Sequence, residues 1–435
     1  MDKFFNQDLL DWVRHSPFPS IQTELPKVID QIKKKKGVQF AVNFLNRLEV
    51  ANGYRKPSIG LYDHAMHFIG GAQKYGCTIA SVLQDDFDVT LIVNKSVTLK
   101  KLEQWYNLDL SSCKILVVPI PFFEENRKGR EHIDPAEVNM KGENPFHIIS
   151  RISGDFDIFI NNSMLEMVYP LANLSVFICH FPERERSRFF HVDKYTEIIF
   201  NSLYTARWIK FRWGLTPHLH LYPPVDMEDA KEDREKKSVI LSVSRFDSGG
   251  NKQQIEMIKA FKRLNKKYPD SIRGWELVLT GGSVGDNPYL EKIHRYMAKY
   301  PFLNVEVRIN VPEDELRAIY RRAKIFWHLC GLNQKDPARV EHFGMNIVEA
   351  MQNSCVPIVF KGGGQTEIVE EGISGYFFTD ETGLLSKTVE LLDKPDKLLQ
   401  LSKNAYERGK RFHVDIFVEK VQAHFRQLLN DYLLF

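Results

Sequence analysis

The chain has 435 residues, 43% hydrophobic and 12% aromatic, which is enough apolar material for more than one core and excludes a disordered or low-complexity protein. Its 59 Lys and Arg nearly balance 56 Asp and Glu, so the net charge of +3 gives no indication of a nucleic-acid partner. The five cysteines are scattered and form no C-x-x-C pair, which indicates neither a disulfide framework nor a zinc site and favours a reducing compartment.

Residues 1–56 are expected to form a helical extension, because their apolar residues recur at helical spacing. The N-terminus lacks the pattern of a signal peptide, and no apolar run approaches the ~18 residues of a membrane span, so a cytoplasmic location is expected. Lys33 to Lys36 follow an amphipathic stretch, which leaves open both a peripheral contact with an anionic membrane and a solvated helix end. For the extension itself, the alternatives are packing on the first domain, a dimer contact, and a role facing the acceptor or the membrane. The sequence does not decide the oligomeric state.

From residue 58 onward, short apolar runs alternate with helical patterns, which is typical of parallel strands joined by crossover helices. The fold class is therefore α/β, and residues 57–225 are expected to form a first Rossmann-like domain. Its strands are expected at residues 58–62, 89–93, 115–118, 158–160, 176–179 and 198–200.

A linker is expected at residues 226–238, where two prolines lead into a charge-dense run with no apolar period. A second alternating series at 239–412 predicts a second Rossmann-like domain, and 413–435 predicts a terminal helix that packs back on the first domain. Two such domains imply a central cleft at the carboxyl ends of their sheets, where ligands bind. Strands are expected at 239–243, 277–280, 305–309, 325–328 and 356–360, and helices at 253–265, 289–299, 313–323 and 345–353.

Two carboxylates flank a helix start in the segment E-H-F-G-M-N-I-V-E, which runs from Glu341 to Glu349. Gly344 and Asn346 mark the beginning of the helix, so Glu341 lies in the loop before it and Glu349 inside it. The exposed amides of a helix start attract anions, and a diphosphate bound there would have a carboxylate on either side. Alone, the pair is more simply explained as two ordinary surface glutamates, because this spacing often occurs by chance.

Two cations lie beside another expected helix start, which comes earlier in the chain. They are Arg245 and Lys252, in the segment S-R-F-D-S-G-G-N-K. A departing nucleoside diphosphate develops negative charge, which these two side chains would stabilise without a metal. In the first half, Gly70 and Gly71 open a helix after the first strand, and His180 ends the strand at 176–179.

Together with the run K-G-G-G-Q-T-E, which contains Gly363 and Gly364, these segments resemble a large family of retaining GT-B glycosyltransferases, the glycosyl transferases group 1. Members of that family include mannosyl-, glucosyl- and N-acetylhexosaminyl-transferases. The resemblance covers most of residues 58–435 and leaves the N-terminal extension outside. The E-H-F-G form, with W-H-x-x-G ahead of it from Trp327, is similar to members that extend polysaccharides or lipid-linked glycans.

The resemblance implies a role for each of these positions. Glu349 would hold the ribose hydroxyls of the donor, while Glu341 and His180 would lie at the donor sugar. Arg245 and Lys252 would clamp the diphosphate. Positions whose backbone would approach the donor are Phe343, Gly344, Met345, Gly363, Gly364, Gly70 and Gly71.

The function expected is transfer of a hexose from a nucleotide-diphosphate sugar, GDP-mannose or a UDP-hexose, to a hydroxyl of a glycan, polysaccharide or lipid-linked acceptor. No cofactor is expected. No metal is expected either, because Asp86-Phe-Asp88 and Asp155-Phe-Asp157 have the D-x-D form but lead directly into strands, where capping explains them. The donor base is not determined, since Asn310 stands where the family usually has glycine before a valine.

Several alternatives stay open. A sugar-nucleotide epimerase or a phosphorylase of the same fold would use a similar site, and a catalytically silent scaffold would keep nucleotide binding without turnover. A dinucleotide dehydrogenase is disfavoured because no G-x-G-x-x-G follows the first strand. Acceptor recognition is expected in the loops 124–142 and 183–188.

Overall fold

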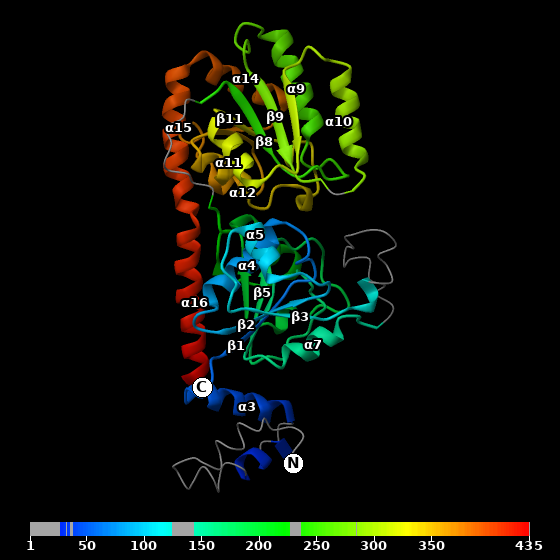
Figure 1. Ribbon diagram of the computed structural model, residues 1–435, viewed down its shortest axis with the longest axis vertical. Coiled ribbons are helices and arrows are strands. Elements are labelled where there is room, and N and C mark those ends of the chain that lie inside the picture. The colour runs from blue at the N-terminus through cyan, green and yellow to red at the C-terminus, as the bar shows by residue number, and fades with distance from the viewer. Residues whose placement is uncertain are drawn as a thin grey trace. The chain divides into compact units, whose positions relative to one another are not determined.

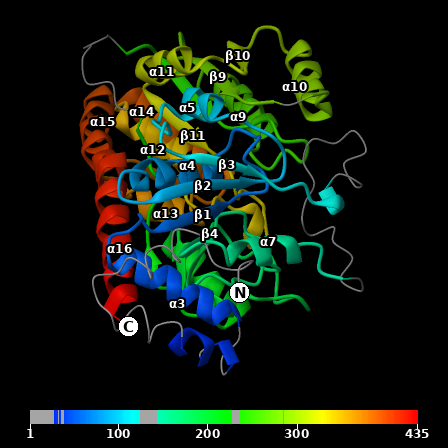
Figure 2. The same ribbon diagram turned by 60° about the horizontal axis from the view of Figure 1, so that its bottom comes forward.

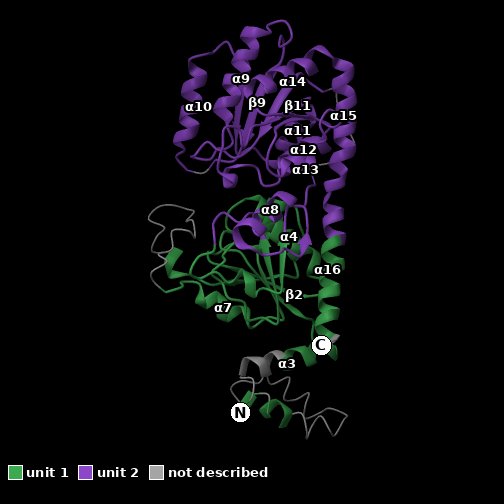
Figure 3. Cartoon of the chain, turned by 180° about the vertical axis from the view of Figure 1, so that it is seen from behind, with its two compact units in different colours: residues 1–178, 186–199, 420–435 green, residues 179–185, 200–419 purple. Residues whose placement is uncertain are grey.

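The computed structural model describes residues 27–31, 33, 34, 38–123, 143–226, 236–283 and 285–434. Within it the chain divides into two compact units (Figure 3). The first consists of Met1–Ile178, Arg186–Ile199 and Lys420–Phe435, and the second of Cys179–Glu185 and Phe200–Glu419. The predicted acceptor loop 124–142, most of the linker and part of the Lys33 to Lys36 run lie outside the described residues.

The first half of the chain builds a seven-stranded sheet in the order β3-β2-β1-β4-β5-β6-β7. The pairings among β1 to β5 are parallel, with β1 central between β2 and β4. These strands read as short apolar runs because both faces of a parallel sheet are covered. The strands are β1 (Ser58–Tyr62), β2 (Asp88–Val93), β3 (Lys114–Val117), β4 (Ile158–Asn161), β5 (Leu174–Cys179), β6 (Glu197–Phe200) and β7 (Leu219–His220).

The C-terminal helix α16 (Val414–Leu434) contributes its last part, from Lys420, to the first unit. There His424 Nε2 lies 2.6 Å from the Glu197 carboxylate, and Asn173 donates to the Tyr432 hydroxyl over 2.9 Å. The Arg47 guanidinium of α3 (Val38–Ala51) lies over the Tyr432 ring, and both views show the end of α16 beside α3 (Figure 1 and Figure 2). The other helices of this unit are α4 (Gly71–Leu83), α5 (Leu99–Tyr106) and α7 (His147–Ser153).

The second unit is built on a six-stranded sheet in the order β10-β9-β8-β11-β12-β13, and all of its neighbouring pairs are parallel. The order reverses between β8 and β11, which is the switch point where ligands of such sheets bind. The strands are β8 (Val239–Val243), β9 (Glu276–Gly281), β10 (Val305–Ile309), β11 (Ile325–His328), β12 (Val356–Phe360) and β13 (Tyr376–Phe378).

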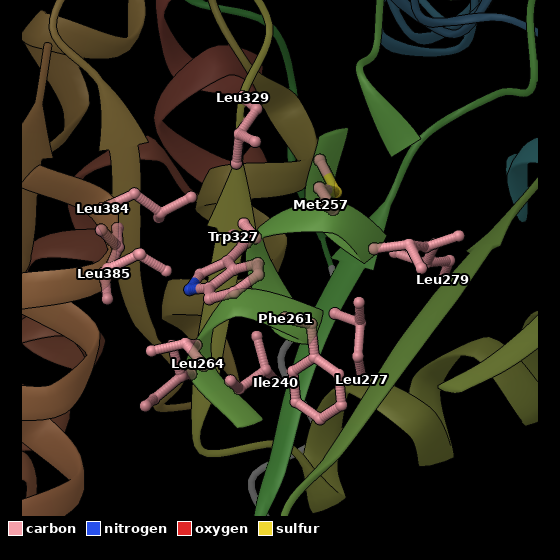
Figure 4. Packing of buried hydrophobic residues seen from close by; sticks show 14 of the residues in the cluster. Ile240, Met257, Phe261, Leu264, Leu277, Leu279, Trp327, Leu329, Leu384 and Leu385 are labelled. Carbon is pink, nitrogen blue, oxygen red and sulfur yellow. The ribbon is translucent and has the colours of Figure 1, made fainter. Parts of the chain in front are cut away.

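Two hydrophobic clusters cover the two faces of this sheet. Along β8, Ile240 enters one cluster while Val239 and Leu241 enter the other, as the two-residue period of a strand requires. In the first cluster Trp327 packs among leucines and Phe261, and its indole N–H donates to Thr388 over 3.2 Å (Figure 4). The helices are α8 (Leu203–Trp208), α9 (Gln254–Lys267), α10 (Pro288–Ala298), α11 (Glu313–Arg322), α12 (Met345–Gln352), α13 (Gln365–Ile368), α14 (Glu381–Asp393) and α15 (Pro395–Gly409).

The two parallel α/β series expected from the sequence are observed, and β1, β8, β10, β11 and β12 have the expected bounds. The sequence analysis did not predict β7, β13, α8, α14 or α15. The contacts also divide the chain differently from the predicted boundary at residue 225, because Phe200 and the residues after it pack within the second unit. There Ser202 donates to the His342 carbonyl over 2.6 Å, and the amides of Leu203 and Tyr204 each donate to Glu367 over 2.8 Å.

All five cysteines are buried and free. Among the described helices, none combines the length and the apolar composition needed to cross a bilayer.

Candidate active site

The candidate site of the second unit lies at the switch point of its sheet, at the carboxyl ends of β8 and β11. Arg245 follows β8 two residues after its end, and His328 is the last residue of β11. The helix α12 begins at Met345 with Gly344 as its N-cap. Strand ends of a parallel sheet meet at one edge, so the sequence order brings these polar groups together there.

An ion pair between Lys252 and Glu341 forms the centre of the site. The Lys252 ammonium lies 2.6 Å from Glu341 Oε2, and the side chains are 21% and 15% exposed. Burial would raise the pKa of Glu341, but the Lys252 charge and the His328 ring together hold that pKa well below its ordinary value. Burial likewise opposes the charge of Lys252, and the Glu341 carboxylate raises the Lys252 pKa above its usual range. Both groups are therefore charged across the neutral pH range.

Arg245 adds a second cation to the same end of the sheet. Arg245 is exposed, and its positive charge acts to lower the pKa of Lys252. Gln254, in the first turn of α9, fixes the backbone here by donating to the Arg245 carbonyl over 3.1 Å and to the Ser244 hydroxyl over 3.1 Å. Lys252 and Glu341 are thus in direct contact, and the charge of Arg245 acts on Lys252. The role of these residues as a phosphate clamp stays a prediction.

Gly363 and Gly364 have a packing role that the sequence analysis did not foresee. A Cβ on Gly363 would lie 2.1 Å from the Glu341 carbonyl oxygen, and one on Gly364 would lie 2.0 Å from the His342 carbonyl oxygen. The Gly364 amide donates to the Glu341 carbonyl over 2.8 Å. These glycines let the K-G-G-G loop pack backbone to backbone against the loop that carries Glu341, so they position the carboxylate whether or not a ligand approaches them. Gly344 adopts φ 113°, a conformation that favours glycine.

Phe343 and Met345 flank that N-cap and point into the protein. Phe343 is 3% exposed and lies against Tyr222 and Phe412, with ring centroids 5.1 and 5.8 Å away. Met345 is partly buried and packs against the hydrophobic cluster to which Phe343 belongs. Their side chains thus anchor the start of α12, and the role predicted for their backbone stays a prediction.

Glu349, one turn inside α12, accepts a hydrogen bond from the buried Tyr320 hydroxyl over 2.6 Å. Tyr320 comes from α11, and burial with the Glu349 charge raises the Tyr320 pKa, so the phenol stays protonated as a donor. Glu349 is partly exposed and its ribose role is untested by these contacts.

His180 belongs to the second unit together with Glu341, although it follows β5 of the first sheet. Its carbonyl accepts from the Thr205 hydroxyl over 3.1 Å. The next residue, Phe181, stacks on the His342 ring with centroids 4.0 Å apart and an angle of 6°. This stack ties the segment of His180 to the residue that follows Glu341.

Gly70 and Gly71 lie in the first unit, at the start of α4. Gly70 is the N-cap and its amide donates to the Tyr106 hydroxyl over 3.2 Å. Ahead of the two glycines in the chain, the buried Asp63 accepts a hydrogen bond from Asn162 over 2.8 Å and one from Gln73 over 3.1 Å. The bond to Gln73 joins the end of β1 to α4, and the role of the glycine loop toward a donor stays a prediction.

One aspartate from each of the two D-x-D sequences, Asp157 and Asp88, forms an ion pair within the first unit. Asp157 is buried, receives two bonds from Arg55 of 2.6 and 2.9 Å, and accepts from the Ser58 amide over 2.8 Å. Asp88 pairs with Lys114 over 2.7 Å. The sequence analysis expected capping for these acids, and the structure shows ion pairs with Arg55 and Lys114.

Three residues of the second unit have the spacing that metal ligation needs. One ligand atom each from His328, Cys330 and Glu341 lies within 4.8 Å of the others. The Lys252 ammonium lies 2.6 Å from Glu341 and 3.8 Å from Cys330 Sγ, where it competes with a cation for the same groups. Burial raises the pKa of Cys330 to about 12, so the thiol is not the thiolate that metals prefer. The arrangement favours an ion pair over a metal centre.

Asn310 replaces the glycine that the resemblance leads one to expect, and it keeps the backbone conformation of a glycine. Its φ is 53°, in the left-handed region that asparagine tolerates better than other residues. Its side-chain oxygen accepts from the Ser283 amide over 2.9 Å. The turn after β10 is therefore stabilised by a side-chain hydrogen bond.

Four residues that the sequence analysis did not select also contact the predicted site: His328, Asn346, Tyr320 and Phe181. The sequence could have indicated His328, because a polar residue at the end of a buried apolar strand faces the edge of the sheet where ligands bind. It could not have indicated Tyr320, because a tyrosine on an amphipathic helix is usually a core residue.

Residues 226–408 match the family model described as glycosyl transferases group 1. The match covers less than half of the chain, and within it the chain is similar to that family. The match contains Arg245, Lys252, Glu341 and Glu349. The resemblance on which the sequence analysis depends is thus confirmed for the second unit.

Solved structures confirm the fold. HepE from Anabaena, solved in complex with UDP and glucose, is 17% identical with a TM-score of 0.63, over 85% of this chain and 100% of that chain. Sucrose-phosphate synthase from Thermosynechococcus elongatus is 15% identical, also with a TM-score of 0.63, over 87% of this chain and 100% of that one. Both likenesses span the two units, and the fold is the predicted GT-B class.

Relatives of known activity match about half of the chain. A GDP-Man:Man(3)GlcNAc(2)-PP-Dol alpha-1,2-mannosyltransferase from Dictyostelium discoideum is 25% identical over 234 residues, 49% of this chain and 43% of that protein. The human protein of the same description is 29% identical over 231 residues, 49% of this chain and 45% of that protein. A trehalose synthase from Thermococcus litoralis is 26% identical over 204 residues, 45% of each protein. The chain thus spans less than half of the length of these relatives.

Proposed function

We propose that the protein is a glycosyltransferase that moves a hexose from a nucleotide-diphosphate sugar to a hydroxyl of a glycan, polysaccharide or lipid-linked acceptor, with retention of anomeric configuration. The family of residues 226–408 supports the transferase class. Relatives described as mannosyltransferases of dolichol-linked glycans support a glycan or lipid-linked acceptor.

The observation that carries the proposal is the ion pair of Lys252 with Glu341 at the switch point of the second sheet, where the charge of Arg245 also acts on Lys252. When the bond between the sugar and the diphosphate breaks, negative charge accumulates on the leaving phosphate oxygen. Arg245 and the partly buried Lys252 would stabilise that charge more than water does, because they are held in place before the reaction. Glu341 keeps Lys252 at the position where the charge develops.

The route that we propose has the acceptor hydroxyl attack the anomeric carbon from the face that the diphosphate leaves. The new glycosidic bond forms as the bond to the phosphate oxygen breaks, and that oxygen takes the acceptor proton. Retention follows because both events use one face. Glu341 is poorly suited to act as a nucleophile in this scheme, since Lys252 and His328 both bind its Oε2.

The donor is GDP-mannose or a UDP-hexose. Mannosyltransferases with GDP-Man in their description favour the first, and HepE solved with UDP and glucose favours the second. A thermal-shift panel of nucleotide sugars separates them, because a donor at 100 times its Kd stabilises the folded state by about 2.7 kcal/mol.

The deciding experiment incubates the purified protein with the best donor and a set of glycan, polyprenyl-linked and simple hydroxyl acceptors. We expect a glycoside product whose anomeric proton coupling in NMR matches the donor configuration. An inverted product would remove the same-face route. Nucleotide binding without turnover across the whole set would instead support a silent scaffold, and an altered sugar nucleotide as the product would indicate an epimerase.

A further inference from the structure

His328 joins three elements of the second unit at the candidate site. It ends β11, is 1% exposed, and lies between Glu341 and Asn346. Its Nε2 is 2.8 Å from Glu341 Oε2, and its Nδ1 is 3.4 Å from the Asn346 amide nitrogen. Asn346 belongs to the first turn of α12 and also reaches the carbonyl of Val243, the last residue of β8.

The bond from Asn346 to Val243 determines the orientation of the Asn346 amide. A backbone carbonyl only accepts, so the amide nitrogen of Asn346 faces it as a donor. The second N–H of that nitrogen is then available to His328 Nδ1, which must act as the acceptor. A neutral imidazole carries its proton on the other nitrogen, so Nε2 donates to Glu341.

The surroundings keep the His328 ring neutral. Burial lowers its pKa, and although the Glu341 carboxylate opposes that shift, the nearby Lys252 charge adds to it. A neutral Nε2–H tautomer gives Glu341 one directed hydrogen bond without adding a second full charge beside Lys252.

Glu341 consequently receives two donors on one oxygen. Within the described residues, the bonds from Lys252 and His328 both end on Oε2, at 2.6 and 2.8 Å. The carboxylate is thereby held in one rotamer and its Oε1 is left for a ligand. His328 acts on Glu341, and through Glu341 on Lys252.

We propose that His328 is a positioning residue, fixed as the Nε2–H tautomer by Asn346, that holds Glu341 and with it Lys252 in the geometry needed for glycosyl transfer. This inference rests on the proposed function for its catalytic consequence. The tautomer itself does not depend on that function and is tested separately.

Two amide substitutions at position 328 separate the hydrogen bond from the bulk of the ring. In His328→Gln the side-chain nitrogen reaches the place of Nε2 and can still donate to Glu341. In His328→Asn the nitrogen reaches only the place of Nδ1, so Glu341 loses its second donor. We expect kcat within about 3-fold of wild type for His328→Gln and a roughly 10- to 100-fold loss for His328→Asn, with a smaller change in the donor KM.

Equal losses in the two variants, with both folded by circular dichroism, would show that only the ring shape matters and would overturn the proposal.

NMR of protein labelled with ¹⁵N-histidine gives a readout that needs no activity, and the signal of His328 is assigned by its loss in His328→Gln. We expect the shifts of a neutral Nε2–H ring at pH 7. A neutral Nδ1–H ring or an imidazolium would also overturn the proposal, whereas a wild-type protein that turns over no nucleotide sugar would contradict the proposed function and leave the tautomer result standing.

Discussion

Lys252 and Glu341 are the pair whose charges matter most at the scale of single residues. They are partly buried and 2.6 Å apart, and charges in such a place interact more strongly than they do in water. An incoming diphosphate would compete with Glu341 for the Lys252 ammonium. The pair therefore keeps the Lys252 ammonium oriented before a ligand binds, and a more highly charged anion can then take the place of Glu341 as its partner.

Replacing Lys252 tests this directly. Lys252→Ala should lower kcat by about 100-fold or more with a smaller change in the donor KM, because the charge is needed most as the diphosphate departs. Lys259→Ala is the matched control, since Lys259 lies further along α9 in a surface pair with Glu256. Steady-state kinetics of the two variants makes the comparison, and equal rates for Lys252→Ala and the control would refute the role of Lys252.

Glu349 should affect the donor differently. Glu349→Ala should raise the Kd of the nucleotide sugar roughly 10-fold, because two ribose hydroxyls would lose an ionised acceptor. Titration calorimetry measures this, with Glu256→Ala as a control that removes a carboxylate from the outer part of α9. An unchanged Kd for Glu349→Ala would remove the ribose assignment.

At the scale of elements, close backbone packing determines where the site residues lie. The K-G-G-G loop after β12 contacts the carbonyls of Glu341 and His342, so the loop before α12 is held by a neighbouring element. In the first unit, Asp63 at the end of β1 is bonded to Asn162 after β4 and to Gln73 of α4. In both cases residues that follow a strand are held against a second element by short contacts, so a change in either partner would displace the other.

Gly364→Ala should therefore be strongly destabilising. Its Cβ would lie 2.0 Å from the His342 carbonyl oxygen, and a clash with backbone requires the loop to move, at a cost of about 2 kcal/mol or more. Gly282→Ala is the control, because a Cβ there meets its nearest neighbour at 3.8 Å. Urea unfolding of both variants gives the free energies, and similar values would show that the second unit accommodates the clash.

Asp63 predicts a dependence of stability on pH. Burial raises its pKa from the ordinary 3.8 to about 6, so the folded state binds its proton more tightly than the unfolded state does. The stability that comes from this proton is present below pH 4 and is lost as the pH rises through about 6. Asp63→Asn cannot titrate, so the difference in unfolding free energy between wild type and variant should change between pH 4 and pH 6.5. A constant difference across that range would show that Asp63 is ionised throughout.

At the scale of the whole molecule, two parallel α/β units of the GT-B class carry different parts of the predicted site. The second contains Arg245, Lys252, Glu341, Glu349 and also His180, while Gly70 and Gly71 belong to the first. Donor binding should thus stabilise the second unit above all. Hydrogen exchange with and without nucleotide would locate that stabilisation.

The protein is expected to work without a divalent metal, because Arg245 and Lys252 are the cations proposed to bind the diphosphate. Activity should change less than about 2-fold when EDTA removes divalent ions and when Mg²⁺ or Mn²⁺ is restored, because Arg245 and Lys252 supply the charge stabilisation. A complete loss in EDTA that Mn²⁺ reverses would contradict the metal-free route and return attention to His328, Cys330 and Glu341.

The sequence alone was sufficient for most strands, although β7 and β13 were missed, and it selected Lys252 and Glu341, which the structure shows in contact. Buried parallel strands such as β8 and β11 require unbroken apolar runs, and chemistry at their ends requires polar residues directly after them, so both leave a local pattern. Glu341 and Lys252 were predicted because each lies beside a helix start and because their segments resemble the family. Their 2.6 Å contact, across 89 positions of the chain, left no pattern of its own.

Only the tertiary structure decided what holds the clamp in place. His328, Tyr320 and the stack of Phe181 on His342 act through neighbours that are distant in the chain, and a buried polar group gains its role from the partner that folding brings to it. The K-G-G-G loop is the clearest case, because a glycine needed for a ligand and a glycine needed for a neighbouring carbonyl look alike in sequence. The spacing of hydrophobic residues indicates which face of a helix or strand is buried. Which atoms contact each other is determined only when the helices and strands have packed together.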